Sequence, residues 1–214
     1  MQINDYSFYN IIFVIFAYIM GSIPTAVWVG TYFYKIDIRE HGSKNAGATN
    51  TFRVLGKRAG IFVLMVDILK GFLAVKLGGT FSEYYANSNP LVNFKIILGI
   101  AAVAGHIFPV FAHFRGGKGV ATLFGVVIAM HWEAACTAAV IFLLVFIISN
   151  YVSLGSILAA LIYPFIIVLV YKSQATSMIY FSMVITVVVL FTHQKNIERL
   201  VKGQESKMRL LKKK

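Results

Sequence analysis

The sequence has 214 residues, of which 58% are hydrophobic and only 13% are charged, and its formal net charge at pH 7 is +12. So few polar side chains cannot cover a soluble domain of this length, which indicates an integral membrane protein instead. The basic residues lie between apolar segments without interleaved aromatic residues, which argues against a nucleic-acid partner.

Long apolar stretches predict the membrane spans, because about 20 apolar residues, or about 30 Å of helix, cross a bilayer. The first stretch is too long for a signal-peptide core and has no basic region before it, so we expect a retained span. The stretch 119–132 would form only about 21 Å of helix, which is too short to cross unaided. The seven predicted segments are 6–34, 59–79, 96–114, 119–132, the two halves of 134–171 divided at SNYVSLGS (149–156), and 173–191.

Lysine and arginine residues gather on one side of this predicted topology. Sixteen of the 20 lie in residues 35–60, 112–118 and 192–214, whereas Lys172 alone lies on the opposite side. Because cytoplasmic loops carry the excess of positive charge, we expect the N-terminus outside and the C-terminus in the cytoplasm. The predicted fold is an all-α integral membrane protein with seven transmembrane helices, one of them a short partial span, in a single domain 1–214.

The first polar block, GSKNAGATNTFRVLGKRAG (42–60), has residue types that suit anionic oxygens. Glycines let backbone N–H groups approach a phosphate, arginine binds it with a bidentate fork, and Asn and Ser add neutral donors. A flexible cytoplasmic loop would carry the same lysines and arginines for topology alone. Composition leaves both interpretations open.

The second block, GHIFPVFAHFRGGKGVAT (105–122), places Gly116, Gly117, Lys118 and Gly119 directly before the predicted short helix. A helix N-terminus favours anions, and a partial span would carry this one into the protein. The spacing is not that of a Walker loop. A tight glycine turn between helices is the alternative.

The third block, HQKNIERLVKGQE (193–205), follows the last predicted span. His193 and Asn196 are three residues apart and would share a face if the helix continues. A polar cap at the membrane interface is the alternative interpretation of the histidine.

Two further features carry weaker signals. Asp67 and Lys70 form an i, i+3 pair inside a span, where ionisable groups are costly and tend to pair structurally. His106 and His113 lie seven residues apart on a conceivable common helical face. With no carboxylate or cysteine beside them in the sequence, a metal site there is disfavoured, and no GxSxG serine-hydrolase motif occurs.

Together the three blocks resemble the bacterial acyl-phosphate:glycerol-3-phosphate acyltransferase family. The resemblance spans nearly the whole chain in the right order, and GSIP at 21–24 and the Asp67/Lys70 pattern also fit it. The motif positions that carry the resemblance are Ser43 to Asn50 with Arg53, Gly56 and Gly60; Gly105, His106, Pro109, Phe111, Phe114 and Gly116 to Thr122; and His193, Asn196, Ile197, Arg199, Leu200, Gly203 and Glu205.

The resemblance implies a bacterial inner-membrane enzyme of phospholipid synthesis with its active site at the cytoplasmic face. It would acylate glycerol 3-phosphate from acyl phosphate, giving lysophosphatidic acid, with no cofactor or metal and with a functional link to the enzyme that makes acyl phosphate. Ser43 and His193 would lie nearest the reaction, and the glycine turn would supply backbone donors. The implied substrate-binding residues are Asn45, Thr49, Asn50, Arg53, Gly116, Gly117, Lys118 and Asn196.

The chemistry leaves three routes for acyl transfer to the glycerol hydroxyl. His193 could act as general base, its ordinary pKa of about 6.5 being suitable. The substrate's own phosphate could take the proton instead, or an acyl-Ser43 intermediate could form. We favour direct attack with Ser43 and His193 in hydrogen-bonding roles. A transporter of phosphorylated anions and an enzyme using acyl-CoA are the alternative functions.

Overall fold

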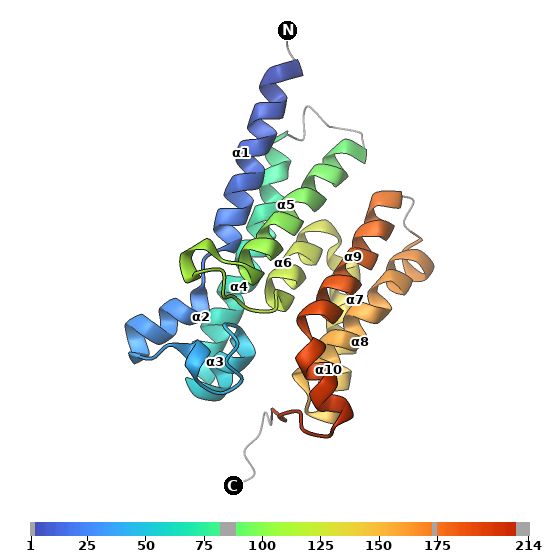
Figure 1. Ribbon diagram of the computed structural model, residues 1–214. Helices are drawn as coiled ribbons and strands as arrows, with labels where there is room; N and C mark the ends of the chain where they lie inside the picture. The colour runs from blue at the N-terminus through green and yellow to red at the C-terminus, as the bar shows by residue number, and fades with distance from the viewer. Residues whose placement is uncertain (1–2, 82–88, 173–174, 209–214) are drawn as a thin grey trace. The chain divides into compact units, whose positions relative to one another are not determined.

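The computed structural model describes residues 3–81, 89–172 and 175–208, and every regular element in these ranges is helical (Figure 1). The chain forms two compact units, Met1–Met130 and His131–Lys214. By length and composition, four helices in the described ranges are able to cross a membrane: Tyr9–Phe33, Pro90–Ala112, Trp132–Ser149 and Val152–Val170.

The remaining predicted segments are helical as well. Helix α9 (Thr176–Thr192) meets α10 (Gln194–Val201) at a bend of 64°, and the pair counts as a fifth candidate span. Helix α4 (Lys57–Leu77) is 21 residues long but carries charged side chains, and α6 (Val120–Met130) has only 11 residues. The all-helical membrane architecture is confirmed, and the count of seven crossings stays a prediction.

Two of the predicted spans of the first unit are present, and each contains a break in its helix. Segment 6–34 is not one straight helix, because α1 ends at Gly21 and the chain turns before Pro24, which has no N–H to donate. Helix α5 ends at Ile107 rather than at 114, and His113 and Phe114 adopt left-handed backbone conformations. The elements are α1 (Ile3–Gly21), α2 (Thr25–Trp28), η1 (Val29–Phe33), η2 (Ile38–Glu40), α3 (Ala48–Val54), α4, η3 (Gly78–Phe81), α5 (Asn89–Ile107), η4 (Val110–Ala112) and α6.

Small residues let the helices of the first unit pack backbone to backbone. A Cβ on Gly71 of α4 would collide with the carbonyl oxygen of Thr122 in α6, and one on Gly125 of α6 would collide with that of Ile68. Such close approach is the usual means of helix association in membranes, where apolar burial between helices adds little. The short helix α6 is therefore held tightly against α4.

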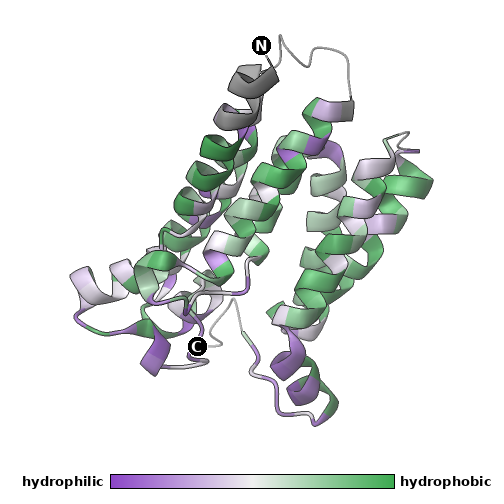
Figure 2. Ribbon diagram, turned by 45° about the horizontal axis from the view of Figure 1, so that its top comes forward, coloured by the Kyte–Doolittle hydropathy of each residue, from purple (hydrophilic) through white to green (hydrophobic). Residues whose placement is uncertain are grey.

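The second unit contains α7 (Trp132–Ser149), α8 (Val152–Phe165), η5 (Ile166–Val170), α9 and α10. The break predicted at 149–156 falls at Asn150, which caps α7 in a left-handed conformation. Large apolar side chains stay exposed on these helices, with Ile148 81% and Val187 65% exposed, as lipid-facing residues are. Figure 2 shows the long helices mainly in hydrophobic colours and α10 in hydrophilic ones.

Candidate active site

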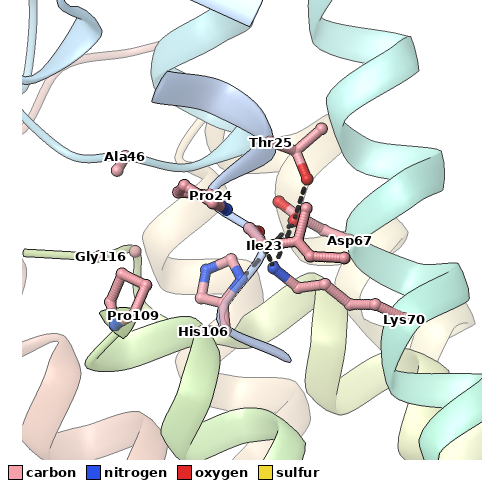
Figure 3. Close-up of a pocket in the computed structure, with 10 residues that line it drawn as sticks. Ile23, Pro24, Thr25, Ala46, Asp67, Lys70, His106, Pro109 and Gly116 are labelled. Atoms are coloured by element: carbon pink, nitrogen blue, oxygen red, sulfur yellow. Dashed lines mark hydrogen bonds and ion pairs between the residues drawn. The ribbon is translucent and has the colours of Figure 1, made fainter. Parts of the chain in front are cut away.

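A small pocket lies within the first unit (Figure 3). Ala46 of the first polar block and Gly116 and Gly117 of the second block line it, so the structure brings these two blocks together. The rest of its lining comes from residues 23–25, Asp67, Lys70, His106 and Pro109.

Charged side chains line this pocket although they are almost completely buried. Lys70 Nζ lies 2.9 Å from Asp67 Oδ1 and donates to the carbonyl oxygen of Ile23 at 2.9 Å. The Thr25 hydroxyl donates to the same Asp67 oxygen at 3.3 Å. The side chains of Asp67 and Lys70 are only 2% and 4% exposed. The predicted i, i+3 pair is confirmed, and buried ions of this kind persist only when paired and hydrogen-bonded.

His106 joins this pair from the end of α5. Its Nδ1 lies 3.6 Å from Asp67 Oδ1 and 3.0 Å from the hydroxyl of Thr122 in α6. Figure 3 shows Asp67, Lys70 and His106 pointing toward one another from two helices. His113 lies beyond the end of α5, so the predicted common helical face for His106 and His113 is wrong.

The glycine loop of the second block folds back onto His106. The backbone N–H of Gly117 donates to the carbonyl oxygen of His106 at 3.1 Å, and that of Gly116 donates to Ile107 at 3.2 Å. The loop therefore uses both of these amides internally, and the role of Gly116 and Gly117 in binding a phosphate stays a prediction. Gly116 and Gly117 still line the pocket, and Lys118 follows them, half-buried, just before α6.

The loop of the first block is shaped by Asn50. Its Oδ1 accepts from the backbone N–H of Ser43 at 2.8 Å, and its Nδ2 donates to the carbonyl oxygens of Ile38 and His41, each at 3.0 Å. This clamp fixes the backbone that carries Ser43. The side chains of Ser43 and Arg53 are exposed at the surface of this unit, and those of Asn45 and Thr49 are half-buried.

An ion pair just before this loop contacts the turn that follows α5. Arg39 holds Asp37 through several hydrogen bonds, the shortest 2.6 Å, and its Nη1 donates to the carbonyl oxygen of Ala112 at 2.9 Å. The guanidinium of Arg39 holds the pKa of the Asp37 carboxyl below its ordinary value. The Arg39–Asp37 pair therefore stays ionised across the physiological range.

The third block lies in the second unit and is organised by Glu205. This carboxylate accepts from Asn196 Nδ2 at 2.6 Å, Arg199 Nε at 2.7 Å and the hydroxyl of Ser153 at 2.8 Å. Burial opposes ionisation of Glu205, but these hydrogen bonds outweigh it, so its pKa lies below the ordinary value. No sequence motif pointed to Ser153, which lies 52 residues before Glu205.

His193 lies at the bend between α9 and α10, so the helix does not continue straight as the shared-face prediction required. Both His193 and Asn196 are nevertheless buried, at 2% and 5% exposure. His193 Nδ1 is 2.8 Å from the carbonyl oxygen of Val189. In a neutral ring that donates from Nδ1, the lone pair is on Nε2.

Within the described ranges, no group of three or more His, Cys, Asp or Glu side chains is arranged to hold a metal ion. The histidine nearest a carboxylate in the first unit, His106, is already engaged by Thr122.

A model of the glycerol-3-phosphate acyltransferase family matches residues 11–203. A glycerol-3-phosphate acyltransferase of Endomicrobium trichonymphae is 41% identical over 205 residues, which cover 96% of this chain and 98% of that protein. Two crystal structures of PlsY (YgiH), an integral membrane glycerol 3-phosphate acyltransferase, are 36% identical to this chain and cover 94% of it. Their glycerol 3-phosphate and lysophosphatidic acid forms superpose with TM-scores of 0.82 and 0.79, over 96% and 95% of those chains.

The chain therefore belongs to the glycerol-3-phosphate acyltransferase family, as the three sequence blocks indicated. It is a multi-pass integral membrane enzyme, and the transporter alternative is set aside.

Proposed function

We propose that this chain transfers an acyl group from acyl phosphate to the 1-hydroxyl of glycerol 3-phosphate, releasing lysophosphatidic acid and inorganic phosphate. The observation that carries the proposal is the match along 94% of the chain to the glycerol 3-phosphate form and the lysophosphatidic acid form of PlsY. The meeting of the first and second blocks at one pocket supports it.

The acyl phosphate donor fits the charges of the polar blocks. Two like unit charges 4 Å apart repel by about 4 kcal/mol at an effective dielectric near 20, so two phosphate-bearing substrates need fixed cations. Arg53 and Lys118 are proposed to supply them, with Asn45, Thr49 and Asn196 as neutral partners. Phosphate is a good leaving group, so no strong general acid is needed.

The proposed step is direct attack by the glycerol hydroxyl on the acyl carbonyl. The new ester C–O bond forms, the acyl–phosphate bond breaks, and the hydroxyl proton passes to a phosphate oxygen or to Nε2 of His193. Ser43 and His193 are the proposed catalytic residues, each in a hydrogen-bonding role. Asn50 is proposed to act by shaping the loop that presents Ser43.

The proposed setting is the bacterial inner membrane, with seven crossings, the N-terminus outside and the chemistry at the cytoplasmic face. The positive charge of residues 35–60 and of the C-terminal segment supports this orientation. Both units are proposed to belong to one acyltransferase domain.

The test is an assay of the purified full chain in detergent with labelled glycerol 3-phosphate. Lysophosphatidic acid should form with acyl phosphate as the sole donor and should not form with acyl-CoA as the sole donor. Product from acyl-CoA alone would reject the proposed donor, whereas absence of product from either donor would reject the proposed reaction.

A further inference from the structure

We propose that Asp67, Lys70, His106 and Thr122 form a positioning network that sets the conformation of the glycine loop 116–119. Through this loop the network would hold Lys118 in place for the phosphate group of a substrate. The inference rests on the proposed function, because it acts through the loop proposed to bind phosphate.

His106 contacts the chain on both sides of Lys118. Its carbonyl oxygen accepts from the backbone N–H of Gly117 at 3.1 Å, just before the lysine. Its Nδ1 meets the hydroxyl of Thr122 at 3.0 Å, in the first turn of α6 just after the loop. One residue thus fixes both ends of a four-residue loop.

The glycines bring the loop into direct contact with the imidazole. A Cβ on Gly117 would collide with Nε2 of His106, and a Cβ on Gly116 would collide with the carbonyl oxygen of His106. Any reorientation of the ring would therefore displace the loop, since no side-chain layer separates them. Close packing transmits such a shift rather than absorbing it.

The ion pair in turn fixes the ring. Asp67 Oδ1 lies 3.6 Å from His106 Nδ1, and Lys70 anchors Asp67 while also holding the carbonyl oxygen of Ile23. All three ionisable side chains are 5% exposed or less. Mutual neutralisation of Asp67 and Lys70 alone would need neither His106 nor Thr122, so the extension toward the loop points to positioning.

The test removes the hydroxyl that closes the network. Thr122→Val keeps the shape of the side chain, and Thr122→Ala removes the same hydroxyl without adding apolar bulk. Because there are two variants, a folding defect in one of them still leaves the other to test the proposal. Lys118→Ala first identifies the substrate whose KM depends on the loop. Both Thr122 variants should raise that KM by about fivefold, the usual scale for one buried hydrogen bond, with kcat changed less than about twofold.

Thr122→Ser should restore the wild-type KM, because it returns the hydroxyl. The matched control is Thr186→Val, which removes a hydroxyl donating 2.7 Å to the carbonyl oxygen of Ala160 in the second unit. This control should leave the KM unchanged. An equal KM increase in Thr186→Val, or no increase in either Thr122 variant, would overturn the proposal.

A double variant shows whether the network acts through the loop. In the Lys118→Ala background, Thr122→Val should raise the KM by less than about twofold, because coupled residues are not additive. A full fivefold effect in that background would reject action through Lys118. If Lys118→Ala itself changes neither KM nor kcat, the phosphate assignment of the proposed function fails, and the positioning inference fails with it.

Discussion

The two units hold their buried carboxylates in different surroundings. In the first unit, Asp67 and Lys70 pair in the middle of a 21-residue helix, with side chains 2% and 4% exposed. In the second, Glu205 is 8% exposed but its partner Arg199 is 39% exposed, next to the polar helix α10. The first pair depends on mutual neutralisation, whereas water helps to solvate the second. The same interaction type should therefore have different costs in the two units.

The largest effect is expected from breaking the first pair on one side. Asp67→Leu leaves the Lys70 ammonium buried with only neutral partners, and should lower the free energy of unfolding by about 3–5 kcal/mol. Thermal unfolding of the purified protein in detergent measures the loss. The double variant Asp67→Leu/Lys70→Met should be more stable than Asp67→Leu alone, and a double variant no more stable than Asp67→Leu would contradict the pairing.

The next effect concerns the close packing that surrounds this pair. Gly125→Ala forces a Cβ onto the carbonyl oxygen of Ile68, a backbone atom that cannot rotate away, and should cost about 1–3 kcal/mol. Gly79→Ala is the matched control, because a Cβ there meets no atom within 4 Å among the described residues. Equal unfolding temperatures for the two variants would show that α4 and α6 are not in backbone contact.

A smaller, pH-dependent effect is expected at Glu205. Its pKa in the folded protein lies below the ordinary 4.5, so its stabilisation is fully present above pH 4.5 and is lost as the pH falls through the lowered pKa. Glu205→Gln should cost about 1 kcal/mol at pH 7 and much less in acid. The free energy of unfolding measured from pH 7 down to pH 3 checks this. If the stability of Glu205→Gln depended on pH as strongly as that of the wild type, the acid-sensitive group would be a residue other than Glu205.

The smallest effect is expected for the exposed pair Glu198–Lys202, which is 2.6 Å apart with side chains 63% and 57% exposed. Solvent screens such i, i+4 pairs, so Lys202→Ala should change stability by less than about 0.5 kcal/mol. A loss as large as that of Glu205→Gln would erase the distinction between buried and exposed partners.

The helices and the ion pair were predictable because their signals are local. Apolar run length and the i, i+3 spacing of Asp67 and Lys70 depend on neighbours along one helix. The family was predictable from the three blocks, because the residues of the motifs and their order along the chain are visible in the sequence alone.

The contacts of His106 were not predictable, because they come from tertiary packing. His106 is 36 residues from Lys70 in sequence, and its pairing with Thr122 depends on how α5 and α6 meet. The backbone hydrogen bonds of the glycine loop were not predictable from the sequence either. Glycine composition suggested amides at Gly116 and Gly117 that could donate to a phosphate, whereas the loop uses both internally. The bend at His193 likewise follows no local helix-breaking residue.

The central claim is that Lys118 belongs to a phosphate site and is not merely one of many charges that orient the chain. The most direct measurement compares acyl transfer from acyl phosphate by Lys118→Ala and Lys57→Ala, where Lys57 is an exposed lysine at the start of α4. Each variant removes one positive charge. The account predicts a loss on the order of 100-fold for Lys118→Ala, because a charge positioned on a substrate is removed. It predicts near wild-type rates for Lys57→Ala, and full activity in Lys118→Ala would contradict it.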